Sequence, residues 1–441
     1  MKIAWFSPLP PQKTGISEYS ELILKYLKNY AQVDLWVDSF QPQQDFYVGF
    51  RVFDYVRQPA FFPLLKTYDV IVYNMGNNAE FHAGIYEVMQ RYPGIIILHD
   101  YVLHHFFAGY WLDKKERPEL YFQIIREQYG ALTEKLARKC FHSGKPLWET
   151  DRVFDYPLCE NIAKQAKGLI VHSEFVKKLI LPYVKGKIIK INHPLFPTPK
   201  ENSNVTRKSF DLPEDKVIIA SLGFLSPPKR LDKVLKVIAQ NDILRESSFI
   251  LIIGEEVIPN YSLRLKDYIK SLGLSEKVKF VGYQPIEFIY EYLACADIYV
   301  NLRFPTTGET SGSLIRMMSL GKPTIVSNIG WYSELPDECV LKVNPYNEEP
   351  ELTSGLERLV KDITLREHIG QAAKTYISQQ HNPKFFIKEL LRFLDEIDKE
   401  NDYIYNKLVD SITDVLMVLD QGDKSLITSL SHQMVWLKPD A

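Results

Sequence analysis

The first 27 residues, MKIAWFSPLPPQKTGISEYSELILKYL, carry the clearest fold signal in the chain. Residues 3–6 form a short apolar run of the strand type, and residues 7–14 form a loop with three prolines. After Gly15, residues 16–27 repeat apolar side chains at three- and four-residue spacing, as an amphipathic helix does. A strand, a loop and a helix in this order predict the first unit of a parallel α/β sheet.

The same alternation continues through most of the chain. Strand-like apolar runs recur at residues 33–37, 70–73, 95–98 and 169–171, and then at residues 217–222, 249–253, 278–281, 298–301 and 324–327. The stretches between these runs are long enough for helices, one of them predicted near residues 231–240. Parallel strands need such crossovers, so we expect parallel sheets.

A proline-rich, polar stretch over residues 192–208 interrupts the pattern and predicts a connection between domains. We therefore expect two Rossmann-like α/β domains, one over residues 1–195 and one over residues 209–378. Ligands of open parallel sheets bind outside the carboxyl ends of the strands, so the expected site is the cleft that the two domains face.

The end of the chain is helical in pattern. Apolar residues recur at three- and four-residue spacing over residues 385–397 and again over residues 403–419. We expect C-terminal helices within residues 379–441, which either pack back on the first domain or form a surface for a partner.

Composition excludes several classes of protein. The chain has 441 residues, 46% of them hydrophobic and 24% charged, which is typical of an ordered globular protein of two or three domains. A net charge of −2 provides no global field for nucleic acid, so no nucleic-acid partner is predicted. Residues 1–11 lack the apolar core of a signal peptide, and no apolar run approaches the ~20 residues of a membrane span. The four cysteines are widely spaced and predict neither a disulfide framework nor a zinc site. We expect a cytoplasmic protein, with peripheral contact at the inner face of a membrane as an open alternative.

Two common nucleotide-binding motifs are missing from the sequence. Neither G-x-G-x-x-G nor G-x-x-x-x-G-K-[ST] occurs, so dinucleotide binding and P-loop hydrolysis are not predicted. Gly15, at the junction of loop and helix, would let backbone N–H groups approach an anion, although a plain turn is the alternative interpretation.

The richest segment is RFPTTGETSGSLIRMMSLGKPTIVSNIGWYSELPD, residues 303–337. Its loop contains Gly308 and Glu309, followed by Thr310, Ser311 and Gly312 at the start of a helix. A phosphate could sit on that helix start, and Glu309 could accept hydrogen bonds from ligand hydroxyls. The alternative is a well-capped helix with Glu309 in its first turn. Farther along this helix, Arg316 either faces the cleft or extends from the polar side.

The segment LGFLSPPKRLDKVL, residues 222–235, places Lys229 and Arg230 at the end of a loop that follows a strand. Two cations at this position could neutralise a diphosphate. Solvated surface is the alternative interpretation for such a pair.

In the first domain, Asn77, His82, His99 and Asp100 follow predicted strands and should lie near strand ends. The three histidines between residues 99 and 105 do not match the helical H-E-x-x-H pattern, and no paired cysteines accompany them. We therefore predict no metal site and no cofactor.

Taken together, these segments resemble the large retaining glycosyltransferase family called group 1, whose members have the GT-B fold of two Rossmann-like domains. The resemblance covers most of the chain, to about residue 397. The segments that carry it are SPLPPQKTGISEYS (7–20), GNNAEFH (76–82), LHD (98–100), LIVHSEFV (169–176), GFLSPPKRLDKVL (223–235), KFVGYQPIEFIYEYLACADIYV (279–300) and GETSGSLIRMMSLGKPTIVS (308–327).

The resemblance implies a nucleoside diphosphate sugar on the C-terminal domain and an acceptor, such as a glycan or a lipid-linked sugar, on the N-terminal one. Its implied functional residues are Gly15 beside the donor, His99 beside the transferred sugar, Lys229 and Arg230 as diphosphate cations, Glu309 near the sugar hydroxyls as the first glutamate of an E-x7-E motif, and Tyr283 near the nucleobase. Thr310, Ser311, Gly312, Ser313 and Arg316 would complete the donor site, and Asn77, His82 and Asp100 are candidates on the acceptor side.

Two departures from the family pattern bear on the nucleotide. Where the family has a second glutamate for the ribose hydroxyls, this chain has Arg316, and the spacing from Glu309 is one residue short. Where the family has a basic residue after the first strand of the second domain, this chain has Phe224.

The resulting hypothesis is a metal-independent hexosyl transfer with retention of configuration, in surface polysaccharide biosynthesis. Fixed cations and N–H groups would stabilise the charge that develops on the leaving diphosphate. Two alternatives stay open: a sugar-nucleotide epimerase or phosphorylase on the same fold, and a non-catalytic scaffold in which Arg316 and Phe224 mark a lost donor site. The sequence leaves the oligomeric state open.

Overall fold

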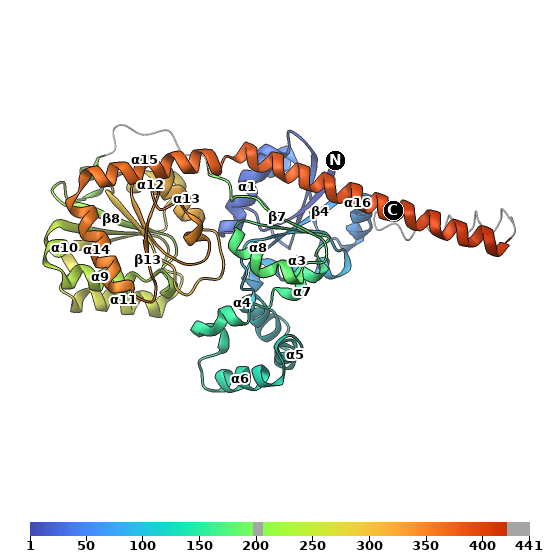
Figure 1. The fold of residues 1–441 in the computed structure, drawn as a ribbon, viewed down its shortest axis with the longest axis horizontal. Coiled ribbons are helices and arrows are strands. Elements are labelled where there is room, and N and C mark those ends of the chain that lie inside the picture. Colours follow the sequence, from blue (N-terminus) through green and yellow to red (C-terminus); the bar gives the residue numbers. More distant parts are fainter. Residues whose placement is uncertain (197–205, 421–441) are drawn as a thin grey trace. The chain divides into compact units, whose positions relative to one another are not determined.

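The computed structural model describes residues 1–196 and 206–420, and no side chain at residues 401–406 and 408–420. The chain divides into two compact units (Figure 1). The first unit contains Met1–His172, Lys177–Ile191 and the chain from Lys384 onward, whereas the second contains Ser173–Val176 and Asn192–Pro383.

The first unit is built on a seven-stranded parallel sheet with the strand order β3-β2-β1-β4-β5-β6-β7. Its strands are β1 (Lys2–Phe6), β2 (Gln32–Val37), β3 (Arg51–Asp54), β4 (Val70–Met75), β5 (Ile95–Leu98), β6 (Gly168–Val171) and β7 (Lys187–Lys190). The strands from β4 to β6 are buried along their whole length, which explains their continuous apolar sequences. The strands β3 and β7 were not predicted from the sequence, because both are short edge strands in which charged residues interrupt the apolar pattern.

Helices cover both faces of this sheet. The helices of the first unit that precede α16 are α1 (Gly15–Leu27), α2 (Gln44–Gly49), α3 (Ala79–Arg91), α4 (His104–Ala108), α5 (Pro118–Tyr129), α6 (Ala131–His142), α7 (Glu160–Gln165) and α8 (Glu174–Ile180), of which α5 and α6 belong to an insertion. Figure 1 shows α3 and α8 on the side of the sheet opposite to α1 and α16 (Pro383–Asp420). The predicted strand, loop and helix at the start of the chain are confirmed as β1, the loop to Thr14 and α1.

A helical insertion separates β5 from β6, and α5 and α6 form an antiparallel hairpin within it (Figure 1). The hairpin has a small core of its own, in which Tyr121, Phe122 and Ile125 of α5 pack against Ala137 of α6 and Leu147. The sequence analysis assigned no function to this insertion.

The helix α16 packs on the first unit. Its apolar side chains Phe386, Leu390, Phe393, Leu394 and Ile397 join the core formed by the sheet and α1. A Cβ on Gly168 would lie 3.1 Å from both Phe393 and Ile397, so the missing side chain at this position lets the helix approach β6 closely.

The prediction that the end of the chain is helical is confirmed, and both predicted stretches belong to the single helix α16. Residues 398–402, DKEND, contain no glycine or proline that would interrupt the helix. Residues 421–441 of the predicted helical segment lie outside the described residues. No helix in the described ranges is long and apolar enough to cross a membrane.

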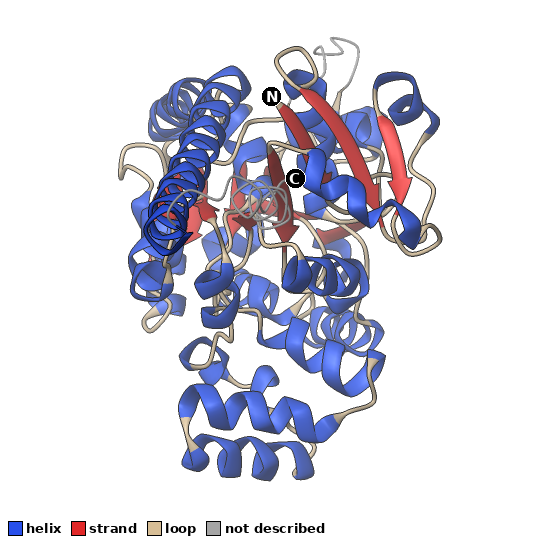
Figure 2. Cartoon of the chain, turned by 90° about the vertical axis from the view of Figure 1, so that its right-hand side faces the viewer, coloured by secondary structure: helices blue, strands red, loops and turns tan. Residues whose placement is uncertain are grey.

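The second unit is built on a six-stranded parallel sheet with the strand order β10-β9-β8-β11-β12-β13. Its strands are β8 (Val217–Leu222), β9 (Ser248–Ile253), β10 (Val278–Gly282), β11 (Ile298–Asn301), β12 (Thr324–Ser327) and β13 (Leu341–Val343). Its helices are α9 (Leu231–Gln240), α10 (Asp242–Ser247), α11 (Pro259–Ser271), α12 (Ile286–Ala294), α13 (Gly312–Ser319), α14 (Glu348–Lys361) and α15 (Ile363–Gln380). Helices lie on both faces of the strands (Figure 2), so the predicted α/β class with two parallel sheets is confirmed.

The limits of the second unit are wider than the range 209–378 predicted from the sequence. The backbone N–H of Leu195 donates to the carbonyl of His381 (2.6 Å), and the Asn192 side chain donates to the carbonyl of Gln380 (2.9 Å). These bonds join the start of the predicted linker to the end of α15. Residues 197–205 of that linker lie outside the described residues.

Candidate functional site

The strand order of the second sheet reverses between β8 and β11, which are neighbours in space. At such a reversal, the loops after the two strands turn to opposite faces of the sheet and leave a crevice for a ligand. Several of the predicted donor residues lie in these two loops, namely Lys229 and Arg230 after β8 and Glu309, Thr310 and Ser311 after β11.

The loop after β8 directs Lys229 into the interior. Lys229 ends a short turn, Pro227–Lys229, and only 7% of the residue is exposed. Its Nζ donates to the carbonyl of Leu222 at the end of β8 (2.7 Å). Gly223 has a φ of 115°, and a Cβ on it would lie 2.6 Å from the Lys229 Nζ. Gly223 therefore supplies both the backbone turn and the space that Lys229 needs. The alternative interpretation of Lys229 as solvated surface was wrong.

The loop after β11 adds a second cation and a carboxylate. Arg303 Nε contacts Glu309 Oε1 (2.5 Å), and both side chains are less than one-fifth exposed. Burial and, to a smaller extent, the positive charge of Arg303 together lower the pKa of Lys229 to about 7, and the negative charge of Glu309 opposes this change. Lys229, Arg303 and Glu309 thus form one electrostatic cluster at the carboxyl end of the sheet.

Glu309 organises its own loop. Its Oε2 accepts hydrogen bonds from the Thr307 backbone N–H (2.8 Å), the Thr307 hydroxyl (2.8 Å) and the Thr306 hydroxyl (2.9 Å). Glu309 lies before the N-cap of α13, so the alternative that places it in the first helical turn was wrong. The carboxylate is held rigidly beside Arg303 at the entrance to that helix.

The start of α13 brings small polar groups to the same crevice. Ser311 is the N-cap, and its hydroxyl accepts from the Leu314 N–H (3.2 Å). The Ser313 hydroxyl lies 3.0 Å from the Ser311 hydroxyl and accepts from the Asn301 Nδ2 (3.2 Å). The Asn301 Oδ1 is buried and has no hydrogen-bond partner within the described part of the chain. These hydroxyls and the helix dipole favour an anion at this position.

The remaining donor-site candidates are placed differently. Arg230 directs its guanidinium to Glu348 at the start of α14, and the cation near Lys229 is Arg303. Arg316 is 9% exposed, and its guanidinium lies over the Phe196 ring at 3.9 Å, so it does not extend into solvent.

Two further donor-site candidates lie in loops. Tyr283 follows β10 and is 54% exposed. Thr310 is half-buried between Glu309 and the N-cap Ser311.

In the first unit, His99 follows β5 and is bound to a buried asparagine. Asn74 Nδ2 donates to the Phe6 carbonyl (3.2 Å), so its Oδ1 is free to accept from His99 Nε2 (3.1 Å). The neutral imidazole then carries its proton on Nε2 and its lone pair on Nδ1. Tyr19 of α1 packs edge-on against the His99 ring (4.7 Å between centroids), and His172 lies 5.3 Å from it. These contacts fix the orientation of His99.

The acceptor-side candidates come together at the end of β4. Asp100 Oδ2 accepts from the Asn77 backbone N–H (3.0 Å), and Asn77 Oδ1 accepts from the Phe106 N–H (3.0 Å). His82 is buried and donates from Nδ1 to the Asn74 carbonyl (3.1 Å). Burial lowers the pKa of His82 to about 4, so this histidine is neutral at physiological pH.

Gly15 is the predicted donor contact of the first unit. It is exposed at the start of α1, where the Thr14 hydroxyl accepts from the Ser17 N–H (3.0 Å). A Cβ on Gly15 would meet no atom within 4 Å, so the turn itself does not require a glycine.

Several residues of these sites were missed by the sequence analysis. They are Gly223, Asn301 and Arg303 in the second unit and Tyr19, Asn74 and His172 in the first. Asn301 and Asn74 are polar residues inside apolar strands, which is a signal that the sequence does carry. The roles of Tyr19 and His172 arise from contacts between distant segments, for which the sequence offers no local signal.

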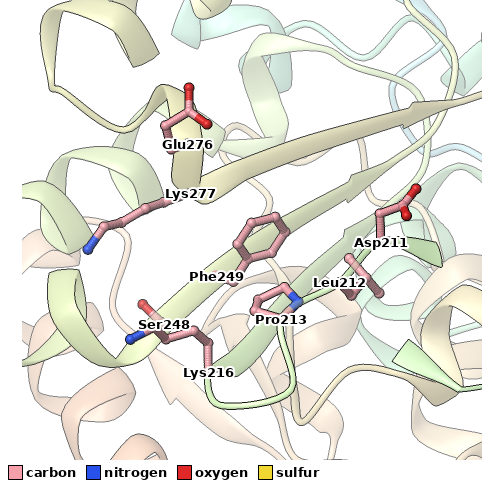
Figure 3. Close-up of a pocket in the computed structure, with 8 residues that line it drawn as sticks. All are labelled: Asp211, Leu212, Pro213, Lys216, Ser248, Phe249, Glu276 and Lys277. Atoms are coloured by element: carbon pink, nitrogen blue, oxygen red, sulfur yellow. The ribbon is translucent and has the colours of Figure 1, made fainter. Parts of the chain in front are cut away.

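A hollow of about 470 Å³ lies elsewhere on the second unit (Figure 3). Its lining includes Lys216, Ser248 and Lys277, which precede or begin β8, β9 and β10. It therefore lies at the amino ends of the strands, opposite to the crevice. Both lysines donate to carbonyls at the end of α10, which gives them a structural role.

Comparison with known proteins agrees with the geometry of the second unit. Residues 202–376 match the family model described as "Glycosyl transferases group 1". These residues form a group 1 glycosyltransferase domain. The group 1 family expected from the sequence is thereby confirmed for this part of the chain.

Curated relatives match part of the chain. An uncharacterized glycosyltransferase of Methanocaldococcus jannaschii is 25% identical over 256 residues, which are 55% of this chain and 62% of that protein. The mannosylfructose-phosphate synthase of Agrobacterium fabrum is 31% identical over 140 residues, which are 30% of this chain and 29% of that protein. The match thus spans less than two thirds of either relative.

Solved structures show that the fold is GT-B. The Anabaena protein HepE in complex with UDP has a TM-score of 0.62 at 16% identity and covers 90% of this chain and 100% of its own. The sucrose-phosphate synthase of Thermosynechococcus elongatus has a TM-score of 0.64 at 15% identity, covering 90% and 99%. The predicted fold class is confirmed.

Proposed function

We propose that this protein is a glycosyltransferase that moves a hexosyl group from a nucleoside diphosphate sugar to a glycan or lipid-linked acceptor. The observation that carries the proposal is the cluster of Lys229, Arg303 and Glu309 beside the start of α13, at the strand reversal of a group 1 domain. Two cations and a helix N-terminus suit a diphosphate leaving group.

In this proposal the second unit binds the donor. Lys229, Arg303 and the N–H groups at Ser311 and Gly312 stabilise the negative charge that develops on the diphosphate as the glycosidic bond breaks. Ser313 and Thr310 border the same anion, and Tyr283 lies beside the nucleobase. HepE binds UDP and UDP-glucose, which supports a uridine nucleotide here.

The first unit supplies the acceptor side and His99. His99, held by Asn74 and Tyr19, would lie beside the transferred sugar, and Gly15 would let the donor approach α1. Asn77, His82 and Asp100 are the candidate contacts of the acceptor. In the part of the chain that the structure describes, no three His, Cys, Asp or Glu side chains form a metal-binding group.

Glu309 would orient the sugar through its hydroxyls. Since Thr306, Thr307 and Arg303 already hold its carboxylate, Glu309 is pre-organised for this task. Metal-independent transfer with retention of configuration, in surface polysaccharide assembly on the cytoplasmic side of a membrane, completes the proposal.

The first test is the thermal stability of the purified protein with UDP, GDP, ADP, CMP and dTDP, each with and without magnesium. A ligand at 100 times its Kd adds about 2.7 kcal/mol of stability. We expect a shift with UDP that is independent of magnesium and lost in Lys229→Ala. Lys270→Ala, which removes an exposed lysine of the same unit, is the matched control.

Activity assays then separate the alternatives. With UDP-glucose and acceptor, we expect Lys229→Ala and Glu309→Ala each to lower turnover at least tenfold in folded protein. Sugar 1-phosphate formed with inorganic phosphate would indicate a phosphorylase, and a new UDP-sugar formed without acceptor would indicate an epimerase. If no nucleotide binds, the scaffold alternative is favoured and the proposal fails.

A further inference from the structure

Arg230 occupies a backbone conformation that suits glycine. It follows the turn Pro227–Lys229 with a φ of 57° and a ψ of 29°, in the left-handed region, and it directly precedes α9. A side chain at such a position strains the backbone, so glycine is the usual residue there. Because Arg230 is the next residue after Lys229, its backbone sets the direction in which Lys229 enters the crevice.

The Arg230 side chain is fixed from the other side of the turn. Its Nε and Nη2 donate to Glu348 Oε2 at 2.9 and 2.7 Å, and the Glu348 side chain is 4% exposed. The guanidinium also lies 5.8 Å from the Phe304 ring, and the Phe304 N–H donates to the Pro228 carbonyl (2.8 Å). The turn that carries Lys229 is therefore anchored both to α14 and to the loop after β11.

The site around Lys229 tolerates little displacement. Its Nζ reaches the Leu222 carbonyl at 2.7 Å while Gly223 leaves room for no more than a hydrogen beside it. A turn that relaxed toward an unstrained φ at Arg230 would withdraw the ammonium group from this position.

We propose that Glu348 is a positioning residue of the donor site, which clamps Arg230 in the left-handed conformation and thereby holds Lys229 at the diphosphate. This inference rests on the proposed function. In this inference, the Arg230 backbone positions Lys229, and the Arg230 guanidinium binds Glu348 and not the ligand.

The test is a rescue experiment with UDP, measured by isothermal titration calorimetry. We expect Glu348→Ala to weaken UDP binding at least tenfold, because Arg230 loses its clamp. In the double variant Arg230→Gly/Glu348→Ala, glycine adopts the left-handed conformation without a clamp and no buried charge is left unpaired. We expect UDP affinity to return to within threefold of the wild type.

The matched control is Glu349→Ala. Glu349 is the next residue on α14 and also links this helix to α9, through Lys233 (2.5 Å) and Lys236 (2.7 Å), but it does not contact Arg230. The UDP affinity of the Glu349→Ala variant should stay within twofold of that of the wild type. If instead the double variant binds UDP no better than Glu348→Ala, the Arg230 guanidinium itself contacts the ligand and the inference is overturned.

A second measurement does not depend on any ligand. Lys229 is faced by Arg303 and Glu309, and burial lowers its pKa to about 7. With lysines labelled with ¹³C at Cε, NMR titration of the ligand-free protein should show this low pKa in the wild type and in the double variant. In Glu348→Ala it should move up toward 10.5.

These two readouts separate the claims. A wild type that binds no nucleotide would overturn the proposed function, while the Lys229 titration would still test the clamp. A folded Glu348→Ala protein, verified by circular dichroism, in which Lys229 titrates as in the wild type would refute the positioning role.

Discussion

Replacing Lys229 by methionine should raise the stability of the second unit relative to the wild type, and this difference should grow as the pH falls. The same replacement should abolish nucleotide binding. Methionine has a similar length and no charge, so it fits the buried space without the cost of burying an ammonium group. In the wild type that cost is visible as the lowered pKa of Lys229, from 10.5 to about 7.

The magnitude follows from the two pKa values. The unfolded chain holds the Lys229 proton up to about pH 10.5, whereas the folded chain loses it near pH 7, so between these limits the unfolded state binds more protons. The free energy of unfolding of the wild type therefore rises with pH in this window. At 1.36 kcal/mol per pKa unit, the destabilisation by Lys229 is ~5 kcal/mol well below pH 7, roughly 4 kcal/mol at pH 7 and under ~1 kcal/mol at pH 10.

The methionine variant also loses the hydrogen bond to the Leu222 carbonyl, which costs about 1–3 kcal/mol at every pH. The pH dependence is therefore the diagnostic quantity. We expect the stability difference, Lys229→Met minus wild type, to fall by roughly 3 kcal/mol between pH 7 and pH 10.

Urea unfolding followed by circular dichroism, at pH values from 6 to 10, measures this difference. The transition of the second unit is the one that UDP shifts in the wild type. Lys270→Met, at an exposed lysine, should show a difference that is flat from pH 7 to pH 9. A flat difference for Lys229→Met as well would mean that Lys229 is charged in the folded protein at neutral pH, and the reasoning would fail.

Three further outcomes follow from the same contacts. UDP affinity should fall up to tenfold per pH unit above about pH 7, because the diphosphate binds the charged form of Lys229; calorimetry from pH 6.5 to 8.5 checks this, and a constant affinity would contradict it. Gly223→Ala should weaken UDP binding at least tenfold, because the added methyl would lie 2.6 Å from the Lys229 ammonium. The control is Gly321→Ala, which also has a positive φ but would be in ordinary contact with its neighbours, and it should leave UDP binding unchanged. Phe393→Ala should lower the free energy of unfolding of the first unit by about 3–5 kcal/mol in urea titrations, because it leaves a cavity in the core. Phe385 is exposed, so Phe385→Ala should lower it by under ~1 kcal/mol, and UDP affinity should be unchanged in both variants.

The parts of the fold that the sequence predicts are those that local patterns determine. The strands β5 and β8 match their predicted limits, because each is a mostly apolar, buried run with a glycine at one end and a polar residue at the other. The edge strand β7, KIIK, was not predicted, because its charged ends resemble a loop. The state of β7 is decided by its pairing with β6, not by its own composition.

The candidate site shows the same division. The position of Lys229 after a strand predicted that it lies at the carboxyl end of the sheet, where strand ends converge. Because Lys229 and Arg230 are adjacent in the sequence, they suggested a pair of diphosphate cations. However, the left-handed backbone conformation of Arg230 directs the two side chains apart, and the Arg230 guanidinium contacts Glu348. The cation beside Lys229 comes from Arg303, more than seventy residues away, through a sheet pairing that no local pattern encodes.

The low pKa of Lys229 explains how a buried cationic crevice persists without its ligand. In the ligand-free protein at neutral pH, the charges of Arg303 and Glu309 balance, and Lys229, whose pKa is about 7, carries its positive charge only part of the time. This arrangement reduces the uncompensated buried charge, which would cost several kcal/mol if Lys229 stayed fully protonated. A bound diphosphate brings the negative charge that makes protonation of Lys229 favourable, so donor binding should take up a proton. The same lysine thus weakens the empty site at low pH and strengthens the occupied one, which is the stability cost expected where a protein pre-organises a charge for its ligand.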